Sequence, residues 1–453
     1  MNIIIVGCGK VGKAITQELN GEGHNIVVID TNQDALDSIS SSLDIMTING
    51  NGIQAATLQD ANASEADLLI AVTSADEVNI LSCLMAKKFG TTHTISRVRN
   101  PEYNDSIHLI KDDLGLSMVI NPELIAAQEI ARLVRFPSAI EIDTFVKGNV
   151  ELFKLKIHEG SILDGMFLNN APILNKFNVR ISGVERGNEV IIPNGDFQLK
   201  ANDKISIIGN SRSISKFCKK IKLINSNVGR NVILVGGGKI SFYLARKLIA
   251  SGVDVKIIEI NHKRCQFLSE TLKYATIIEG DGTDQQLLLE EGVETADALA
   301  TLTDFDEENI ILSLFVQTIS KCKIITKINK LSFDKVIESL NLDSIIHPKN
   351  LAAKYIVRYV RAMHNSYGKS NIETLYSIMG SKAEALEFKV KEHSKVVDIP
   401  LKDLKLKDNL QVACIYRKDS VIIPTGNDYI QQKDTVIIIT THSGFDDIDD
   451  ILE

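Results

Sequence analysis

The sequence contains no tryptophan, and aromatic residues make up only 5% of its 453 positions. It therefore offers neither the aromatic belts of membrane proteins nor an obvious platform for stacking bases. An excess of basic residues is also missing. The 50 Lys and Arg residues stand against 58 Asp and Glu, a net charge of −8. This balance argues against a protein that binds nucleic acid through a basic face.

Cysteine is scarce and long apolar runs are absent. The six cysteines form no C-x-x-C pair and no zinc-ligand spacing, so we expect reduced thiols and no disulfide scaffold. No apolar run approaches the roughly 20 residues needed to span a bilayer. The start of the chain, MNIIIVGCGKVG, is typical of the first strand of a fold, not of a signal peptide. We therefore expect a soluble, cytoplasmic protein that reaches a membrane only through a partner.

Apolar residues make up 44% of the chain, enough for packed cores, and the sequence repeats itself. IIIVGCG, which begins at residue 3, matches VILVGGG, which begins at residue 232. VIIPNGD and VIIPTGN match near the end of each half. The order of units is therefore A-B-A′-B′. We place the four units at residues 1–124 (A), 140–225 (B), 230–353 (A′) and 373–453 (B′).

The A units alternate short apolar runs with stretches of helical period, such as the helix expected at 75–89. This alternation predicts an α/β fold with a Rossmann-like, doubly wound parallel sheet. The B units carry turn signals instead, PNGD (193–196) and ANDK (201–204), between β-branched runs. We expect each B unit to be a small α+β module with hairpins at these signals.

One segment connects the two kinds of unit in the first half. Residues 121–136 follow the sixth expected strand, place a proline in the first helical turn and are apolar on one face. They either bridge A to B or pack against a neighbouring subunit.

A glycine loop follows the first expected strand and opens a helix. It reads Gly7-Cys8-Gly9-Lys10-Val11-Gly12, a G-x-G-x-x-G pattern whose backbone N–H groups can face a pyrophosphate. Asp30 ends the second strand, where a carboxylate accepts hydrogen bonds from ribose hydroxyls and repels a 2′-phosphate. The loop and acid predict a site for NAD(H) in preference to NADP(H). The alternative is a glycine-rich turn followed by an Asp that caps the next helix.

Other polar residues end neighbouring strands at the same edge. Asn51 and Gly52 follow the third strand, where an adenine edge would lie, although a simple turn explains them as well. Thr73 and Ser74 end the fourth strand, and Arg97 ends the fifth. We expect Arg97 to bind phosphate, because a guanidinium pairs with it bidentately.

The A′ unit repeats this constellation with changes. Its candidate binding residues are Gly236, Gly237, Gly238, Lys239, Ile240, Glu259, Asp281 and Thr303. Ser241 replaces the third glycine, Asp304 replaces Ser74, and Lys327 replaces Arg97. We expect a second nucleotide site here, for a nucleotide that need not be the same.

The machinery of an enzyme is missing. None of the nine histidines recurs at matching positions in the two halves, and there is no Walker P-loop, no G-x-S-x-G and no cluster of metal ligands. We therefore assign no catalytic residue and no metal site, and we expect a sensor and not an enzyme. The alternatives are an NAD-dependent oxidoreductase of the saccharopine-dehydrogenase type and a regulator of another cation carrier.

Together, the motifs GCGKVG, NGNG, the D-E-x-N stretch and VIIPNGD resemble the RCK (KTN) domain with its C-terminal companion. Two such pairs in one chain resemble the TrkA family, the peripheral subunits of Trk-type potassium uptake. The resemblance implies a cytoplasmic gating subunit on the inner face of a membrane transporter of the TrkH/TrkG type.

It also implies homo-oligomers whose sites bind NAD(H), ATP or ADP, with A units pairing across the helix at 121–136. Glu123 would then lie near the nucleotide rim, and Lys349 would take its place in the second half.

Overall fold

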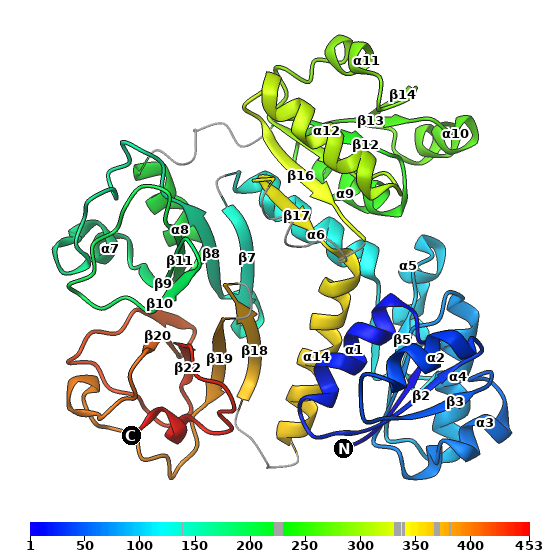
Figure 1. Cartoon of the computed structure of the whole chain (residues 1–453), viewed down its shortest axis with the longest axis horizontal. Helices are drawn as coiled ribbons and strands as arrows, with labels where there is room; N and C mark the ends of the chain where they lie inside the picture. Colours follow the sequence, from blue (N-terminus) through cyan, green and yellow to red (C-terminus); the bar gives the residue numbers. More distant parts are fainter. Residues whose placement is uncertain (138, 222–229, 330–336, 338–339, 367–371, 380–381) are drawn as a thin grey trace.

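The structure is a computed structural model that describes residues 1–137, 139–221, 230–329, 337, 340–366, 372–379 and 382–453. The predicted boundary at 225 lies outside these residues. Figure 1 shows the four units, with A in blue, B in teal, A′ in green and B′ in orange and red.

The A unit is a six-stranded parallel sheet in the order β3-β2-β1-β4-β5-β6. The first strand is a run of four buried aliphatic residues, as a sheet covered on both faces requires. The strands are β1 (Asn2–Val6), β2 (Asn25–Asp30), β3 (Met46–Asn49), β4 (Leu68–Ala71), β5 (His93–Arg97) and β6 (Met118–Ile120). The helices are α1 (Lys10–Asn20), α2 (Gln33–Ser40), α3 (Ala55–Asp60), α4 (Asp76–Phe89) and α5 (Pro101–Ile110), with a short 3-10 turn, η1 (Ala63–Glu65).

The A′ unit repeats the same topology, with the order β14-β13-β12-β15-β16-β17. Its strands are β12 (Asn231–Val235), β13 (Asp254–Glu259), β14 (Ala275–Glu279), β15 (Ala298–Thr301), β16 (Lys323–Lys327) and β17 (Ser344–Ile346). Its helices include α9 (Lys239–Ile249), α10 (His262–Thr271), α11 (Gln285–Glu290) and α12 (Asp306–Ile319). The predicted pair of doubly wound sheets is confirmed.

Each B unit is a five-stranded antiparallel sheet, ordered β10-β9-β11-β8-β7 in B and β18-β19-β22-β20-β21 in B′. The B strands are β7 (Ala139–Phe145), β8 (Val150–Lys156), β9 (Arg180–Arg186), β10 (Glu189–Ile191) and β11 (Lys204–Gly209), with helices α7 (Pro172–Phe177) and α8 (Ser211–Lys220). The B′ strands are β18 (Ile372–Ile378), β19 (Ala383–Lys389), β20 (Leu410–Arg417), β21 (Ser420–Ile422) and β22 (Thr435–Thr440). Short 3-10 turns are η2 (Val146–Gly148), η3 (Leu168–Asn170), η4 (Leu401–Asp403) and η5 (Ile448–Ile451).

The predicted hairpins at PNGD and ANDK are wrong. Both motifs lie in the connection between β10 and β11, and β9 separates these two strands in the sheet. The hairpin joins β9 to β10 instead, at Gly187, whose φ of +61° favours glycine. The turn residues at 193–196 and 201–204 therefore serve a crossing loop.

Two long helices exchange partners between the halves. α6 (Pro122–Arg135) leaves the A unit and packs on α9 of A′, while α14 (Pro348–Ser366) leaves A′ and lies beside α1 of A (Figure 1). Buried Ile356, Val357 and Val360 of α14 join the core that contains Ile15 and Leu19 of α1. The segment at 121–136 therefore leads from A to B and also packs on the other half of the same chain.

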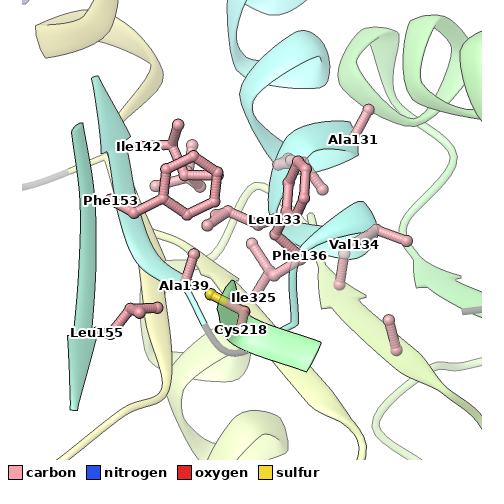
Figure 2. Packing of buried hydrophobic residues seen from close by; sticks show 14 of the residues in the cluster. Ala131, Leu133, Val134, Phe136, Ala139, Ile142, Phe153, Leu155, Cys218 and Ile325 are labelled. Atoms are coloured by element: carbon pink, nitrogen blue, oxygen red, sulfur yellow. The ribbon is translucent and has the colours of Figure 1, made fainter. Parts of the chain in front are cut away.

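The C-terminal end of α6 is fixed by the B sheet. Figure 2 shows Leu133 and Phe136 facing Ile142 of β7 and Phe153 of β8, with Ile325 of β16 nearby. The rings of Phe136 and Phe153 meet edge to face, with their centroids 4.9 Å apart. One continuous core thus joins α6, the B sheet and the A′ sheet.

The B and B′ sheets pack against each other through buried aliphatic side chains, including Leu152 and Ile208 from B and Ile437 and Ile439 from B′. Arg180 of β9 also donates to the carbonyl oxygen of Val412, at 3.1 Å. Within the described part of the chain, no helix combines the length and the apolarity that crossing a bilayer requires.

Candidate functional site

The first cleft opens where β1 ends and α1 begins. Gly7 has a φ of +107°, and a Cβ there would lie 2.9 Å from the backbone nitrogen of Thr73. A Cβ on Gly12 would lie 1.9 Å from the carbonyl oxygen of Gly7. A Cβ on Gly9, in contrast, would meet no described atom within 4 Å. Gly7 and Gly12 therefore shape the loop, while Gly9 leaves the N-terminus of α1 open to a ligand.

Asp30 holds the loop in this shape. One carboxylate oxygen accepts a hydrogen bond from the backbone N–H of Cys8 at 2.5 Å, and the other accepts one from the N–H of Asn32 at 2.8 Å. Each carboxylate oxygen can accept a second hydrogen bond, and Asp30 lines the cleft. The acid can thus position the loop and still accept from a ribose hydroxyl.

The first cleft has a volume of about 520 Å³, within the usual range of small-molecule sites. Cys8 and Gly12, two of our candidates, do not line it. The buried thiol of Cys8 instead donates to the carbonyl oxygen of Ala35. Ten of the twelve candidates that we named in the A unit line it, namely Gly7, Gly9, Lys10, Val11, Asp30, Asn51, Gly52, Thr73, Ser74 and Arg97.

Arg97 brings a buried positive charge to the end of β5. The residue is only 9% exposed, and its guanidinium donates to the carbonyl oxygen of Thr73. Its Nε has no hydrogen-bond partner among the described residues. Burial lowers the pKa of Arg97 to about 10, with Arg99 adding to the effect, so the side chain stays charged at neutral pH.

Asn79 of α4 connects the end of β5 to Thr73, which follows β4, and the sequence analysis did not select it. Its fully buried amide oxygen accepts from the backbone N–H and the hydroxyl of Thr73, both at 2.7 Å. Its amide nitrogen donates to the carbonyl oxygen of Arg97 at 3.0 Å. Asn309 makes the same contacts to Thr303 and Lys327. The recurrence of this Asn in both halves was the available signal.

A residue of the other half also lines the first cleft. Lys349, near the N-terminus of α14, faces it together with Lys10 and Arg97. Lys10 in turn donates to the carbonyl oxygen of Asn329 in A′, at 3.3 Å. The sequence analysis placed Lys349 at the rim of the second half alone, as the counterpart of Glu123. That placement was incomplete, because the exchange of α6 and α14 brings the two rims together.

The glycine loop of A′ is built on the same plan. Gly236 has a φ of +97°, and a Cβ on Gly238 would meet no described atom within 4 Å. The carboxylate of Glu259 accepts from the N–H of Gly237 at 2.6 Å and from that of Asn261 at 2.8 Å. Ser241 fits in place of a glycine by donating its hydroxyl hydrogen to the carbonyl oxygen of Gly236.

Other candidates in A′ form local contacts. The carboxylate of Asp281 accepts from the N–H and the hydroxyl of Thr283, at 2.8 and 2.7 Å, and these bonds lower the pKa of Asp281. Lys239 and Ile240 form the start of α9, as Lys10 and Val11 do in α1.

Two charged contacts distinguish the candidate site of A′ from that of A. Arg264 donates to the carbonyl oxygens of Gly237 and Gly238, at 2.6 and 3.2 Å. Lys327, the counterpart of Arg97, lies 3.1 Å from the carboxylate of Asp304. In A′, the lysine at the position of Arg97 therefore has a carboxylate partner within the same unit.

Comparison with known families agrees with this architecture. The TrkA-N domain matches residues 3–122 and 232–348, and the TrkA-C domain matches residues 152–222 and 385–453. The chain belongs to the TrkA family. The resemblance drawn from the sequence is thereby confirmed.

Individual TrkA-family proteins match this sequence over nearly its whole length. The Trk system potassium uptake protein TrkA homolog of Archaeoglobus fulgidus is 34% identical over 451 residues and covers 100% of both chains. The TrkA homolog 2 of Methanosarcina mazei is 33% identical and covers 98% of each. The TrkA protein of Halomonas elongata is 31% identical, with 97% of this chain and 95% of that protein covered.

Solved structures share the fold of this TrkA-family chain. The GsuK channel bound to NAD has a TM-score of 0.63 at 17% identity, covering 97% of this chain and 76% of the channel chain. The GsuK RCK domain has the same TM-score and identity, with 97% and 92% covered. The GsuK bound to ADP has a TM-score of 0.51 at 15% identity, with 79% and 69% covered.

The groups that line this site in the TrkA-family chain suit an anion. Its polar groups are backbone N–H groups at a helix N-terminus, a carboxylate that fixes the loop, and the cations Lys10, Arg97 and Lys349. Among the described residues, no group of three or more His, Cys, Asp or Glu side chains could hold a metal ion. Such a set of groups can bind an anionic ligand.

Proposed function

We propose that this chain is a nucleotide-binding regulatory subunit of a Trk-type potassium uptake system. It works as a homo-oligomer in the cytoplasm, docked on the inner face of a membrane transporter of the TrkH/TrkG type. NAD(H), ATP or ADP bind at the glycine loops and favour one arrangement of the units. A ligand gates transport only through its different affinity for the two arrangements.

The observation that carries this proposal is the first cleft itself. Gly9 leaves free space at the N-terminus of α1, and the Nε of buried Arg97 has no hydrogen-bond partner among the described residues. Both features favour an anion such as a pyrophosphate. The names of the relatives, potassium uptake proteins, and the NAD and ADP of the GsuK channel structures support the choice of system and ligand.

A physical route leads from the first cleft to B′. The loop opens α1, and α1 packs along α14. Near the end of α14, Arg361 donates from Nε to a carboxylate oxygen of Glu22, at 2.7 Å, and from another nitrogen to the carbonyl oxygen of Leu375 in β18, at 3.1 Å. One side chain thus contacts A and B′ from α14, and in this proposal it passes a shift of α1 on to the B′ sheet.

Titration of the purified chain with NAD, NADH, ATP and ADP tests the proposal. Calorimetry gives the affinity and stoichiometry, and Asp30→Ala and Glu259→Ala variants assign each ligand to a half. Potassium flux into vesicles that hold the transporter, with and without the chain and each ligand, tests regulation. Binding without any effect on flux would contradict the regulatory role, and turnover of NADH by the purified chain would favour the oxidoreductase.

A further inference from the structure

Helix α8 of the B unit carries positive charge along one face. Its exposed cations recur with a helical period, so they share an arc of about 100° around the helix axis. They are Arg212, Lys216, Lys219 and Lys220. We call these four residues the basic stripe.

The opposite face of α8 is apolar and anchors the helix. Ile214, Phe217 and Cys218 are buried, and they join the continuous core that also contains Ala139 of β7 (Figure 2). A helix fixed in this way keeps its polar face turned to the outside of the protein. The basic stripe therefore belongs to a defined surface of the B unit.

The basic stripe has no acidic partner within the described part of the chain. Its four side chains make no hydrogen bond or ion pair there, and α8 itself contains no acidic residue. Lys219 and Lys220 suit the last turn, because a helix C-terminus carries partial negative charge. Arg212 lies in the first turn, where a cation is unfavourable. The helix dipole thus does not explain the stripe as a whole.

The B′ unit carries the opposite charge at the matching place. After its last strand, β22, the chain forms the short turn η5, which contains Asp449 and Asp450. The chain as a whole has a net charge of −8. An anionic surface would attract α8 and repel η5, so the distribution of charge also orients the chain.

The chemistry of the basic stripe indicates the class of partner. Three of its four cations are lysines, compact charges on flexible chains that suit a fluid array of phosphate headgroups. Nucleic acid is a poorer match, because the chain is acidic overall and contains no tryptophan on which bases could stack. The cytoplasmic loops of membrane proteins are themselves rich in Lys and Arg, so they would repel the stripe.

Going beyond the function proposed above, on which the location at a membrane rests, we propose that the basic stripe docks on anionic phospholipid headgroups. The B unit then contacts the bilayer beside the transporter. The stripe shares no residue with the first cleft, so lipid and nucleotide bind at separate places. Because the attraction is electrostatic and exposed to solvent, it weakens as the salt concentration rises.

Co-sedimentation of the full chain with vesicles that lack the transporter tests this inference. We expect binding to phosphatidylcholine vesicles that also contain phosphatidylglycerol, and no binding to phosphatidylcholine alone. The triple variant Lys216→Gln, Lys219→Gln and Lys220→Gln should bind the anionic vesicles about 100-fold more weakly, because each cation contributes about a factor of five. Its affinity for nucleotides should stay that of the unmodified chain.

A matched control removes three exposed lysines of B′, through Lys391→Gln, Lys402→Gln and Lys405→Gln. The net charge changes by the same amount, but these lysines stand among acidic residues such as Glu392 and Asp403. The control should bind anionic vesicles as the unmodified chain does. Unchanged thermal unfolding of both triple variants excludes misfolding as the cause of a loss.

The outcomes separate this inference from the proposed function. Absence of binding to anionic vesicles, or equal losses in the two triple variants, would overturn the role of α8 and leave the regulatory function standing. Full vesicle binding by the α8 variant, with a changed oligomeric state in light scattering, would make the stripe a contact between copies of the chain. Nucleotides that fail to alter potassium flux would refute the proposed function, whether or not the chain binds lipid.

Discussion

The substitution Gly9→Val tests the first cleft most directly. The backbone of Gly9 has a φ of −73° and a ψ of −173°, an extended conformation that valine adopts without strain. A Cβ there would meet no described atom within 4 Å, so the new side chain enters the cleft and displaces nothing. We expect the fold to be retained, with a change in unfolding free energy below about 1 kcal/mol.

The expected loss of binding follows from the loop geometry. A phosphate at the N-terminus of α1 accepts hydrogen bonds from backbone N–H groups, and each such charge-assisted bond contributes about 1.5–3 kcal/mol. The valine side chain fills that space and removes two of them, about 3 kcal/mol or more. Since about 1.4 kcal/mol is a factor of ten, affinity at the first cleft falls about 100-fold or more.

Calorimetry of three variants provides the assay. Gly9→Val should remove one binding site per chain, and Gly238→Val, whose Cβ also faces open space, should remove the other if it is occupied. Gly7→Ala is a contrasting variant, because its φ of +107° and a contact of 2.9 Å predict lost stability as well as lost binding. Full stoichiometry and unchanged affinity in Gly9→Val would refute the assignment of this loop to phosphate.

Three further outcomes are expected. Asp30→Ala should weaken NADH binding about tenfold or more, because it removes a ribose acceptor and the hydrogen bond that Cys8 donates; unchanged calorimetric affinity would take Asp30 out of the site. Asp143 lies in β7, where burial, with Glu141 adding to the effect, raises its pKa from 3.8 to about 8. The folded state therefore binds this proton more tightly, and stability falls as pH rises from about 4 to 8. Asp143→Asn should flatten that fall in urea unfolding midpoints measured at pH 5 and 8, and an unchanged slope would contradict it. Arg361→Gln breaks the contact with Glu22, so it should lower the free energy of unfolding by about 1–3 kcal/mol in urea. It should also uncouple nucleotide binding from potassium flux, and flux that still responds fully to nucleotide would refute the route through α14.

The two parallel sheets and their glycine loops could be predicted because local sequence patterns determine them. The run Ile3–Val6 before a glycine loop defines a buried strand and the turn after it, and the same pattern returns at Val232–Val235. These patterns depend on neighbours in the sequence, so they predict both sheets and the candidates that line the first cleft.

The errors arose where pairing between distant segments decides the structure. Turn residues at 193–196 signal a change of direction but do not say which strand follows in the sheet, so the hairpin was misplaced. Lys349 could not be assigned to the first cleft, because its position depends on α14 packing on α1. Asn79 was overlooked since a polar residue within a helix shows its partners only in three dimensions.

The exchange of α6 and α14 takes place within one polypeptide. The sequences of the A and A′ units can therefore diverge, and their pairing does not depend on protein concentration. Two separate subunits encoded by one gene must carry identical residues at matching positions. Here the two halves can differ, as Glu123 of α6 and Lys349 of α14 do. The covalent link also keeps the partners at a high effective concentration, so the pairing cannot be lost when the protein is scarce. The chain can therefore keep two unlike A units in a fixed one-to-one ratio.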